Sequence, residues 1–276
     1  MPDEVPVIGQ GTWMIGENGD RAGEIAALRA GIARGLTHID TAEMYGSGLA
    51  ETLIGEAIAD IPRDDLFIVS KVLPSNASFE ATVGACEQSL RRLRLDHLDV
   101  YLLHWRGRYP LAETFGAFEQ LIKEGKIRAF GVSNFDIPDL EEARSLGTSS
   151  PIACNQVLYH LRERHIDAGL VDYCQQHHIA VVGYSPFGHG RASFPPLASA
   201  GGRVLAEIAA RHRTTPRQIA LAFLARATPL FAIPKASTLV HVEENAGALD
   251  VNLTANDIRR IDAAFPAHPR DELPAI

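Results

Sequence analysis

Short apolar stretches alternate with amphipathic helical stretches along the whole chain, and eight strand-like stretches can be counted in its 276 residues. Stretches such as Phe67–Val72 and Leu98–His104 are almost continuously apolar instead of alternating apolar and polar residues. Such strands are buried on both faces, as in a parallel sheet covered by helices. Eight strand–helix units in this length predict a single-domain (β/α)8 TIM barrel over residues 1–276, with long βα loops at its C-terminal face.

The expected strands follow one another at regular intervals. They are Val5–Trp13, Thr37–Asp40, Phe67–Val72, Leu98–His104, Ile127–Ser133, Ile152–Tyr159, Ile179–Ser185 and Leu230–Pro234. Helices are predicted between them from apolar residues at helical spacing and from caps, including Asp136 and the capping box of Thr215 and Gln218. Gly188–Gly202 is rich in Gly, Pro and Ser and is predicted to form a long loop over the barrel mouth.

Charge and cysteine content narrow the classes of function. The formal net charge of −8 argues against a nucleic-acid partner, which a basic face would attract. The three cysteines are far apart and lack metal-ligand or disulfide spacing, which favours a reducing compartment. Neither a signal-like N-terminus nor a membrane-spanning apolar run is found, so we expect a cytoplasmic protein without a membrane partner.

Titratable side chains stand where three consecutive strands end. Asp40 and Lys71 close two of them, His104 closes the third, and Tyr45 follows Asp40 in the next turn. Parallel neighbouring strands bring these four side chains together. A phenol donates a proton at neutral pH only if a cation stabilises its phenolate, and Lys71 held by Asp40 is such a cation. With His104 directing an N–H at a substrate oxygen, the group can protonate a developing alkoxide.

Each of these residues also has a purely structural interpretation. A tyrosine after a strand usually packs, a strand-end lysine is often a surface charge, and a histidine is usually only hydrogen-bonded. No second histidine or cysteine lies at ligand spacing from His104, so we expect no metal site. All four residues at successive strand ends are harder to explain by chance.

At these positions the chain resembles the aldo-keto reductases, and the resemblance extends over nearly its whole length. The segment from Asp40 to Gly46 is similar to that family's Asp-Thr-Ala-x-x-Tyr-Gly signature. Further similar segments follow in the family's order: Ser70-Lys71, Leu103-His104-Trp105, Gly131–Phe135, Cys154–Val157, Tyr184-Ser185-Pro186 and Ile233-Pro234-Lys235. The resemblance implies NADPH-dependent hydride transfer to a carbonyl carbon, with Tyr45 as the general acid. It also implies that Lys71 lowers the pKa of Tyr45, that Asp40 pairs with Lys71, and that His104 orients the carbonyl.

The resemblance further implies how NADP(H) is held across the barrel mouth. Ser133, Asn134 and Gln156 are expected to hold the carboxamide, and Tyr184 to stack on the nicotinamide ring. The pyrophosphate contacts are expected from Ser185, Phe187 and Gly188.

The adenosine end departs from the family pattern. The 2′-phosphate clamp of the family has a lysine, then a serine or threonine, and an arginine six residues after the lysine. Here Lys235 is followed by Ala236, and His241 takes the arginine position. A neutral imidazole lacks the fixed, forked charge that suits phosphate, although Ser237 or Thr238 can assist Lys235. We therefore expect NADPH to be preferred, with NADH also accepted. The adenine contacts are expected from Glu244 and Asn245.

A small carbonyl compound is the expected substrate, and a monomer the expected state. The loop after His104 is short, and Trp13 and Trp105 are expected to line the mouth, with core packing as the alternative for Trp13. Arg106 and Arg108 suit an acidic or hydroxylated carbonyl compound unless they are simply solvated. The chain is most similar to bacterial members of the family that reduce small aldehydes such as methylglyoxal.

Two other functions remain open from the sequence. The first is a non-catalytic NADP(H)-binding sensor or accessory subunit on the same fold. The second is an aldolase-like enzyme in which Lys71 forms a Schiff base. The second leaves the tyrosine, the histidine and the cofactor-contact positions unexplained.

Overall fold

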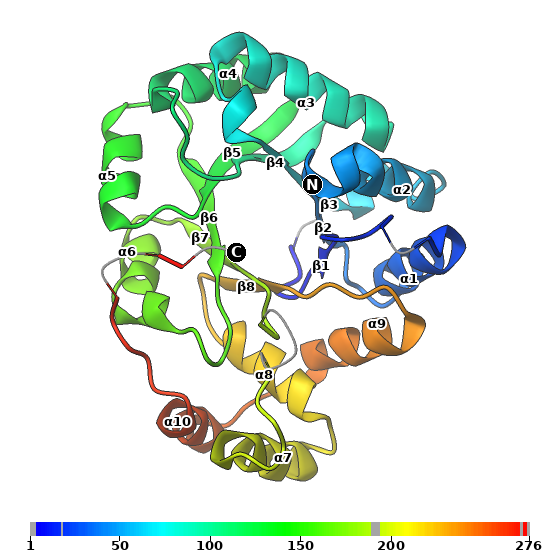
Figure 1. The fold of residues 1–276 in the computed structure, drawn as a ribbon, viewed down its shortest axis with the longest axis vertical. Helices are drawn as coiled ribbons and strands as arrows, with labels where there is room; N and C mark the ends of the chain where they lie inside the picture. The colour runs from blue at the N-terminus through cyan, green and yellow to red at the C-terminus, as the bar shows by residue number, and fades with distance from the viewer. Residues whose placement is uncertain (1–3, 18, 189–193, 271–272, 275–276) are drawn as a thin grey trace.

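The structure, a computed structural model, is an eight-stranded parallel barrel and describes residues 4–17, 19–188, 194–270 and 273–274. The strands are hydrogen-bonded in chain order, which confirms the predicted barrel (Figure 1). Their bounds are β1 Gln10–Gly11, β2 His38–Asp40, β3 Phe67–Val72, β4 Leu98–Leu103, β5 Ile127–Ser133, β6 Ile152–Leu158, β7 Ala180–Tyr184 and β8 Leu230–Ile233.

The barrel is closed where the chain's first strand meets its last. Single parallel bridges join Ile8 to Ala232 and Gly11 to Lys235, beside a hydrogen bond of 3.0 Å from the Gly11 N–H to the Pro234 carbonyl. A side chain at Gly11 would meet the Ile233 carbonyl oxygen at 2.6 Å, so this approach requires glycine. The sequence predicted a short strand within Val5–Trp13 that runs into a turn, and regular pairing in β1 covers two residues only, Gln10–Gly11.

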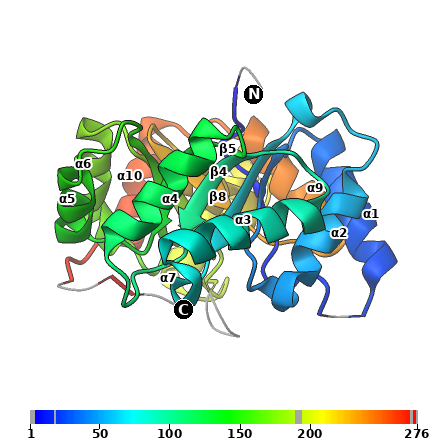
Figure 2. The same ribbon diagram turned by 90° about the horizontal axis from the view of Figure 1, so that it is seen from above.

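The helices form a ring around the barrel (Figures 1 and 2). Asp136 caps α5 and the capping box of Thr215 opens α8, as the sequence predicted. Asp136 forms a capping box as well, with Asp139. The helix bounds are α1 Arg21–Ala33, α2 Leu49–Ala57, α3 Phe79–Leu93, α4 Leu111–Lys123, α5 Ile137–Ser145, α6 Leu170–Gln176, α7 Ala200–His212, α8 Pro216–Leu224, α9 Leu239–Ala246 and α10 Ala255–Ala264.

Helix α7 was missed by the sequence prediction, which extended a loop to residue 202. The helix begins at Ala200, capped by Ser199, whose hydroxyl accepts a hydrogen bond from the Gly202 N–H. It buries Leu205 and Ile208 and packs beside α8 and α10 (Figure 1). Two glycines in the first turn concealed the helical pattern. Residues 189–193 of the predicted loop lie outside the described residues.

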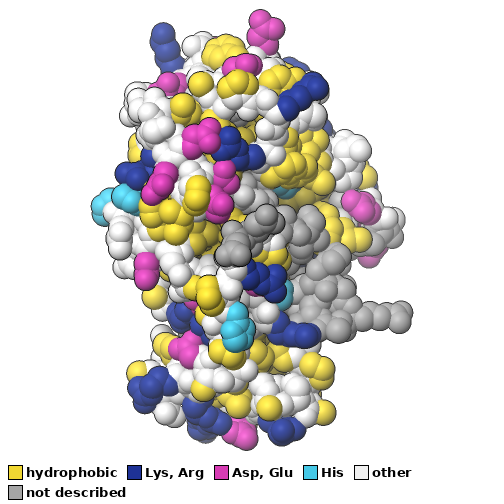
Figure 3. All heavy atoms as spheres, turned by 60° about the vertical axis from the view of Figure 1, so that its left-hand side comes forward, with side chains coloured by type: hydrophobic (Ala, Val, Ile, Leu, Met, Phe, Trp, Pro, Cys, Tyr) yellow, Lys and Arg dark blue, Asp and Glu magenta, His cyan; other side chains and the backbone are white. Residues whose placement is uncertain are grey.

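The main core fills the space between the sheet and the helices. Its centre is aromatic: Phe118 packs against Phe115, Phe130 and Tyr101, with ring centroids 5.3–6.0 Å away. A separate cluster fills the barrel interior, where a largely apolar cavity of about 210 Å³ lies below Asp40. Within the described residues, no helix has the length and apolar character needed to cross a bilayer. On the face in Figure 3, basic side chains are interspersed with acidic and apolar ones.

Candidate active site

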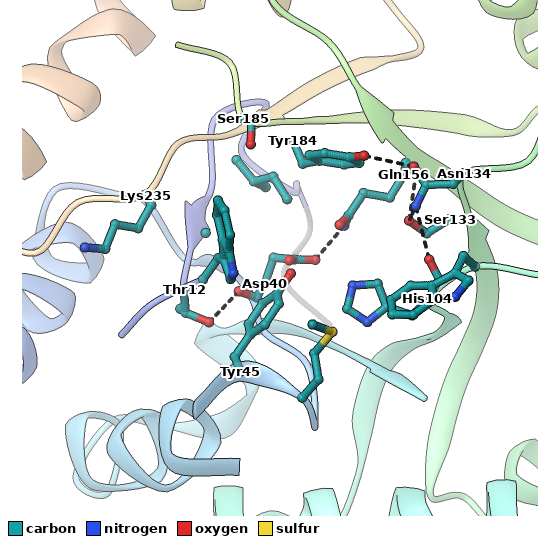
Figure 4. Close-up of a pocket in the computed structure, with 15 residues that line it drawn as sticks. Thr12, Asp40, Tyr45, His104, Ser133, Asn134, Gln156, Tyr184, Ser185 and Lys235 are labelled. Carbon is teal, nitrogen blue, oxygen red and sulfur yellow. Dashed lines mark hydrogen bonds between the residues drawn. The ribbon is translucent and has the colours of Figure 1, made fainter. Parts of the chain in front are cut away.

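A pocket of about 190 Å³ opens at the C-terminal ends of the strands and collects most of the residues singled out in the sequence (Figure 4). Asp40 comes from the end of β2, His104 from just beyond β4, and Tyr45 from the turn after β2. The full lining is Gly11, Thr12, Trp13, Asp40, Met44, Tyr45, His104, Trp105, Ser133, Asn134, Gln156, Tyr184, Ser185, Ile233 and Lys235.

A buried ion pair lies beneath this pocket. The side chain of Lys71 is 0% exposed and that of Asp40 2%, with 2.5 Å between Nζ and Oδ1. Lys71 Nζ also donates to the Thr41 carbonyl at 2.8 Å and to the Tyr45 hydroxyl at 3.4 Å. An ammonium has three N–H donors, and here they serve a carboxylate, a carbonyl and the phenol.

The second oxygen of Asp40 is held by a residue 116 positions away. Gln156 Nε2 donates to Asp40 Oδ2 at 2.7 Å, so both carboxylate oxygens have a partner. Thr12 Oγ1 donates to the Asp40 backbone carbonyl at 2.9 Å. The resemblance implied that Gln156 holds the cofactor carboxamide. In the structure its amide nitrogen fixes the carboxylate that holds Lys71. Nothing in the sequence indicated either contact with Asp40.

The pKa of Tyr45 is raised above its ordinary value of 10.0. Burial of the phenol is the main cause, the charge of Lys71 lowers the pKa only in part, and Asp40 raises it further. The expected effect of Lys71 is thus present but outweighed by burial. Burial also favours the neutral amine of Lys71, yet Asp40 and Tyr45 together raise the pKa of Lys71 above its usual 10.5. At neutral pH the site therefore holds a protonated phenol beside a charged ammonium.

His104 is uncharged in this environment. Burial and the nearby charge of Lys71 lower the pKa of His104 to about 2. Its ring stands edge-on to Tyr45 with 5.8 Å between ring centroids, and it also contacts Trp105 at 4.8 Å. Its buried Nδ1 atom has no hydrogen-bond partner among the described residues. The neutral ring can direct an N–H into the pocket without adding charge.

Backbone and amide groups form the wall opposite Tyr45 (Figure 4). The Tyr184 hydroxyl donates to Asn134 Oδ1 at 3.0 Å, and Asn134 Nδ2 donates to the His104 carbonyl at 3.2 Å. The Ser133 hydroxyl donates to the Gln156 carbonyl at 2.9 Å. Asn134 and Ser185 have φ of +60° and +50°, a left-handed conformation that is rare outside glycine. Such strain concentrates at ligand sites, where surrounding contacts hold it in place.

Lys235 lies at the other end of the pocket from His104 (Figure 4). Its Nζ atom donates to the Ser237 hydroxyl at 3.1 Å. His241 is exposed in the first turn of α9, and Glu244 accepts a hydrogen bond of 2.7 Å from the Thr215 hydroxyl. Several residues expected at the cofactor lie outside the set that lines the pocket: Phe187, Gly188, Ser237, His241, Glu244 and Asn245.

Comparison with known proteins shows which family the chain belongs to. The model of the aldo/keto reductase family matches residues 7–265. The chain belongs to the aldo/keto reductase family. Methylglyoxal reductase YeaE of Escherichia coli is 47% identical over 265 residues, which cover 95% of this chain and 92% of that protein. Glyoxal reductase of Bacillus subtilis is 36% identical over 94% of this chain and 89% of that protein.

Solved structures of the family agree with this assignment. An aldo/keto reductase from Klebsiella pneumoniae, solved in complex with NADP and acetate, superposes with a TM-score of 0.90 at 44% identity. The match covers 99% of this chain and 96% of that one. A second Klebsiella pneumoniae aldo-keto reductase, in complex with NADPH, has a TM-score of 0.86 at 43% identity.

The residues of this aldo/keto reductase fit an extended dinucleotide phosphate. Amide and hydroxyl groups of Ser133 and Asn134 cluster at one end of the pocket, where they suit a carboxamide. At the other end, no carboxylate among the described residues pairs with Lys235, whose partner is a neutral hydroxyl. A cation without a counter-ion at the edge of a cleft suits a phosphate.

The substrate end of this aldo/keto reductase contains two tryptophans, and neither Arg106 nor Arg108 of the loop after His104 lines the pocket. Trp13 and Trp105 both line the pocket, and Trp105 is 39% exposed. Arg106 is engaged away from the pocket, with Nη1 2.7 Å from carboxylate oxygens of both Asp139 and Glu142. Arg106 is therefore neutralised by α5, which removes the reason for expecting it to attract an acidic substrate.

Proposed function

We propose that this aldo/keto reductase reduces a small aldehyde or ketone to the alcohol with NADPH, and that Tyr45 is the general acid. The observation that carries the proposal is the position of the Tyr45 hydroxyl, which lies in the pocket and 3.4 Å from a buried, charged lysine. Methylglyoxal-like α-dicarbonyls are the favoured substrates. Support comes from the small pocket and from relatives that are named methylglyoxal and glyoxal reductases.

NADPH, when bound, supplies the hydride that reaches the carbonyl carbon. Tyr45 gives its proton to the oxygen on which negative charge develops. The raised pKa of Tyr45 keeps the donor form present at neutral pH, and the ammonium of Lys71 stabilises the phenolate that remains. Asp40 holds that ammonium in place, and Gln156 holds Asp40.

His104 orients the carbonyl in this proposal. As a neutral ring beside Tyr45, it can donate an N–H to the same oxygen without competing as an acid. Trp13 and Trp105 enclose the substrate and limit its size. Ser133, Asn134 and Gln156 hold the nicotinamide carboxamide, and Tyr184 stacks on the ring. The pyrophosphate and adenosine contacts come from Ser185, Phe187, Gly188, Lys235, Ser237, His241, Glu244 and Asn245.

The preference between NADPH and NADH follows from the residues proposed to contact the 2′-phosphate. Lys235 supplies a charge for the 2′-phosphate, while His241 lacks the permanent charge of an arginine. NADPH is therefore preferred over NADH, with weaker discrimination than an arginine would confer. Comparing kcat/KM for the two cofactors tests this preference, and an equal or higher value with NADH would refute it.

The deciding experiment follows loss of NADPH absorbance with methylglyoxal in the wild type and in Tyr45→Phe. The substitution removes the proton donor and keeps the ring, so folding and cofactor binding should persist while turnover falls by about 10² to 10⁴. Tyr109→Phe, outside the pocket, is the matched control. An unaffected Tyr45→Phe enzyme would refute the role of Tyr45. NADPH binding with no turnover of a carbonyl panel would favour a sensor instead.

The contacts of Lys71 argue against the aldolase-like alternative. A Schiff base requires a neutral, accessible amine. Lys71 is fully buried, its pKa is raised, and its donors serve Asp40, Thr41 and Tyr45. Borohydride trapping with substrate should leave Lys71 unmodified.

We also propose that the enzyme acts as a single-domain monomer on a small-molecule carbonyl substrate. The residues that line the proposed site come from the strand ends and loops of one barrel, which supports a single domain. Three free, buried cysteines suit the reducing cytoplasm. The net charge of −8 supports the absence of a nucleic-acid partner.

A further inference from the structure

Arg217, in the first turn of α8, lies against two phenylalanine rings beside the proposed cofactor site. Its guanidinium carbon is 4.5 Å from the ring centroid of Phe187 and 5.2 Å from that of Phe194. The two rings meet edge to face with 5.8 Å between centroids. The aromatic contacts fix the plane of the guanidinium, so its N–H groups are preorganised.

The positive charge of Arg217 has no acidic partner in the part of the chain that the structure describes. Other half-buried arginines of this protein do have one, such as Arg92 with Glu51 and Arg226 with Asp167. The first turn of α8 contains no acidic residue, and a cation near a helix N-terminus is electrostatically disfavoured. The position therefore lacks a compensating anion within the described protein.

The neighbours of Arg217 belong to both halves of the proposed dinucleotide site. Phe187, which stacks on the guanidinium, is in the segment proposed to contact the pyrophosphate. Thr215, two residues before Arg217, donates a hydrogen bond of 2.7 Å to Glu244, which is proposed to contact adenine. Arg217 thus stands on the helix that lies between these two groups of residues.

We propose that Arg217 is a further cofactor-binding residue of this enzyme, and that its guanidinium pairs with the pyrophosphate of the bound dinucleotide. Phe187 and Phe194 are positioning residues that hold the guanidinium. The inference rests on the proposed function, because it requires a nicotinamide dinucleotide in the pocket. It adds a permanent positive charge to a site in which His241 stands in place of the family's arginine.

The test is the dissociation constant of NADPH and of NADH, measured by quenching of tryptophan fluorescence. The two tryptophans, Trp13 and Trp105, both line the pocket, so the signal reports occupancy without catalysis. Removing one charge-assisted contact in Arg217→Gln should weaken binding about tenfold or more. Because both dinucleotides contain the pyrophosphate, the loss should be similar for each. Arg217→Lys, which keeps the charge, should lose less.

The control Arg260→Gln removes the same charge from a surface arginine paired with Glu207 on α7. It should bind both cofactors like the wild type and keep the wild-type kcat. Unchanged binding in Arg217→Gln, or weakening confined to NADPH, would overturn the assignment to the pyrophosphate. A wild type that binds neither cofactor would instead refute the proposed function itself.

Discussion

Two buried aspartates of this barrel, Asp40 and Asp99, form similar ion pairs that have different roles. Asp40 ends β2 at the pocket and pairs with Lys71. Asp99, near the start of β4 and therefore toward the opposite end of the barrel, pairs with Arg63 at 2.6 Å and Arg128 at 3.0 Å. Each aspartate is 1% exposed.

The two pairs differ in where their cations lie. The side chains of Arg63 and Arg128 are 16% and 31% exposed, so water shares their charge. Lys71 is completely buried, and its remaining donor points to the Tyr45 hydroxyl at 3.4 Å. The pair at Asp99 is complete in itself and fastens strands together. The pair at Asp40 keeps the buried charge of Lys71 beside the Tyr45 hydroxyl, which can lose and regain a proton.

The largest expected effect is that of Lys71→Met. Breaking a buried pair from one side costs about 3–5 kcal/mol of unfolding free energy, because Asp40 stays buried with Gln156 as its remaining side-chain partner. Turnover should fall by about 10² or more, as for loss of the acid. Urea unfolding and NADPH-dependent activity measure the two effects. A stable, active variant would show that the two aspartate sites do not differ as described.

Asp99→Asn should affect stability alone. The expected loss is about 1–3 kcal/mol, smaller than at Lys71 because both arginines can be hydrated when the carboxylate is removed. The carbonyl of asparagine can still accept the 2.8 Å hydrogen bond from the Ile68 N–H. Urea unfolding and kcat/KM with methylglyoxal check this prediction. A large fall in kcat/KM with unchanged stability would contradict it.

The comparison extends to two neutral histidines, His104 at the pocket and His38 below it. Burial lowers the pKa of His38 to about 4. The unfolded chain, with a histidine pKa near 6.5, therefore binds more protons between these values, so stability falls as the pH drops below about 6.5.

Replacing His38 with leucine should reduce that pH dependence. The variant should lose a slope of up to about 1.4 kcal/mol per pH unit between pH 6 and 5, because one linked proton is removed. Urea unfolding at pH 7, 6 and 5 in the variant and the wild type gives the difference. Identical slopes in the two proteins would mean that His38 titrates equally in the folded and unfolded chain.

The smallest expected effect is at Arg106, whose ion pairs are partly exposed. Arg106→Gln should change stability by less than about 1 kcal/mol, and it should leave the relative rates on acidic and neutral carbonyl compounds unchanged. A selective loss of activity on acidic substrates would show that Arg106 reaches the pocket. Steady-state rates on a matched pair of carbonyl compounds decide the point.

Much of the barrel could be predicted because its strands and caps are local in sequence. Phe67–Val72 is one continuous apolar run, and Asp136 and Thr215 cap their helices through contacts three residues away. Helix α7 escaped prediction because its first turn is Ala200-Gly201-Gly202, a composition typical of a loop. Its stability comes instead from burying Leu205 and Ile208.

The proposed tetrad was recognisable because each member ends a strand or follows one. The residues that hold or surround these four could not be recognised, because their role depends on closeness in space and not on closeness in sequence. Gln156 reaches Asp40 across 116 residues, and Met44 and Ile233 line the pocket with no polar group to draw attention. The balance that sets the pKa of Tyr45 was equally hidden, because it depends on how deeply the phenol is buried.

All three N–H donors of Lys71 are occupied, and this affects how Tyr45 regains its proton between turnovers. Lys71 has no exposed surface, and its donors are occupied by Asp40, Thr41 and Tyr45, so it offers no path by which solvent could pass a proton to Tyr45. In the proposed mechanism, the phenolate of Tyr45 would then recover its proton from the pocket side. The carbonyl substrate, the alcohol product and this proton would therefore all pass through the same opening, and reprotonation of Tyr45 would be linked to release of the alcohol.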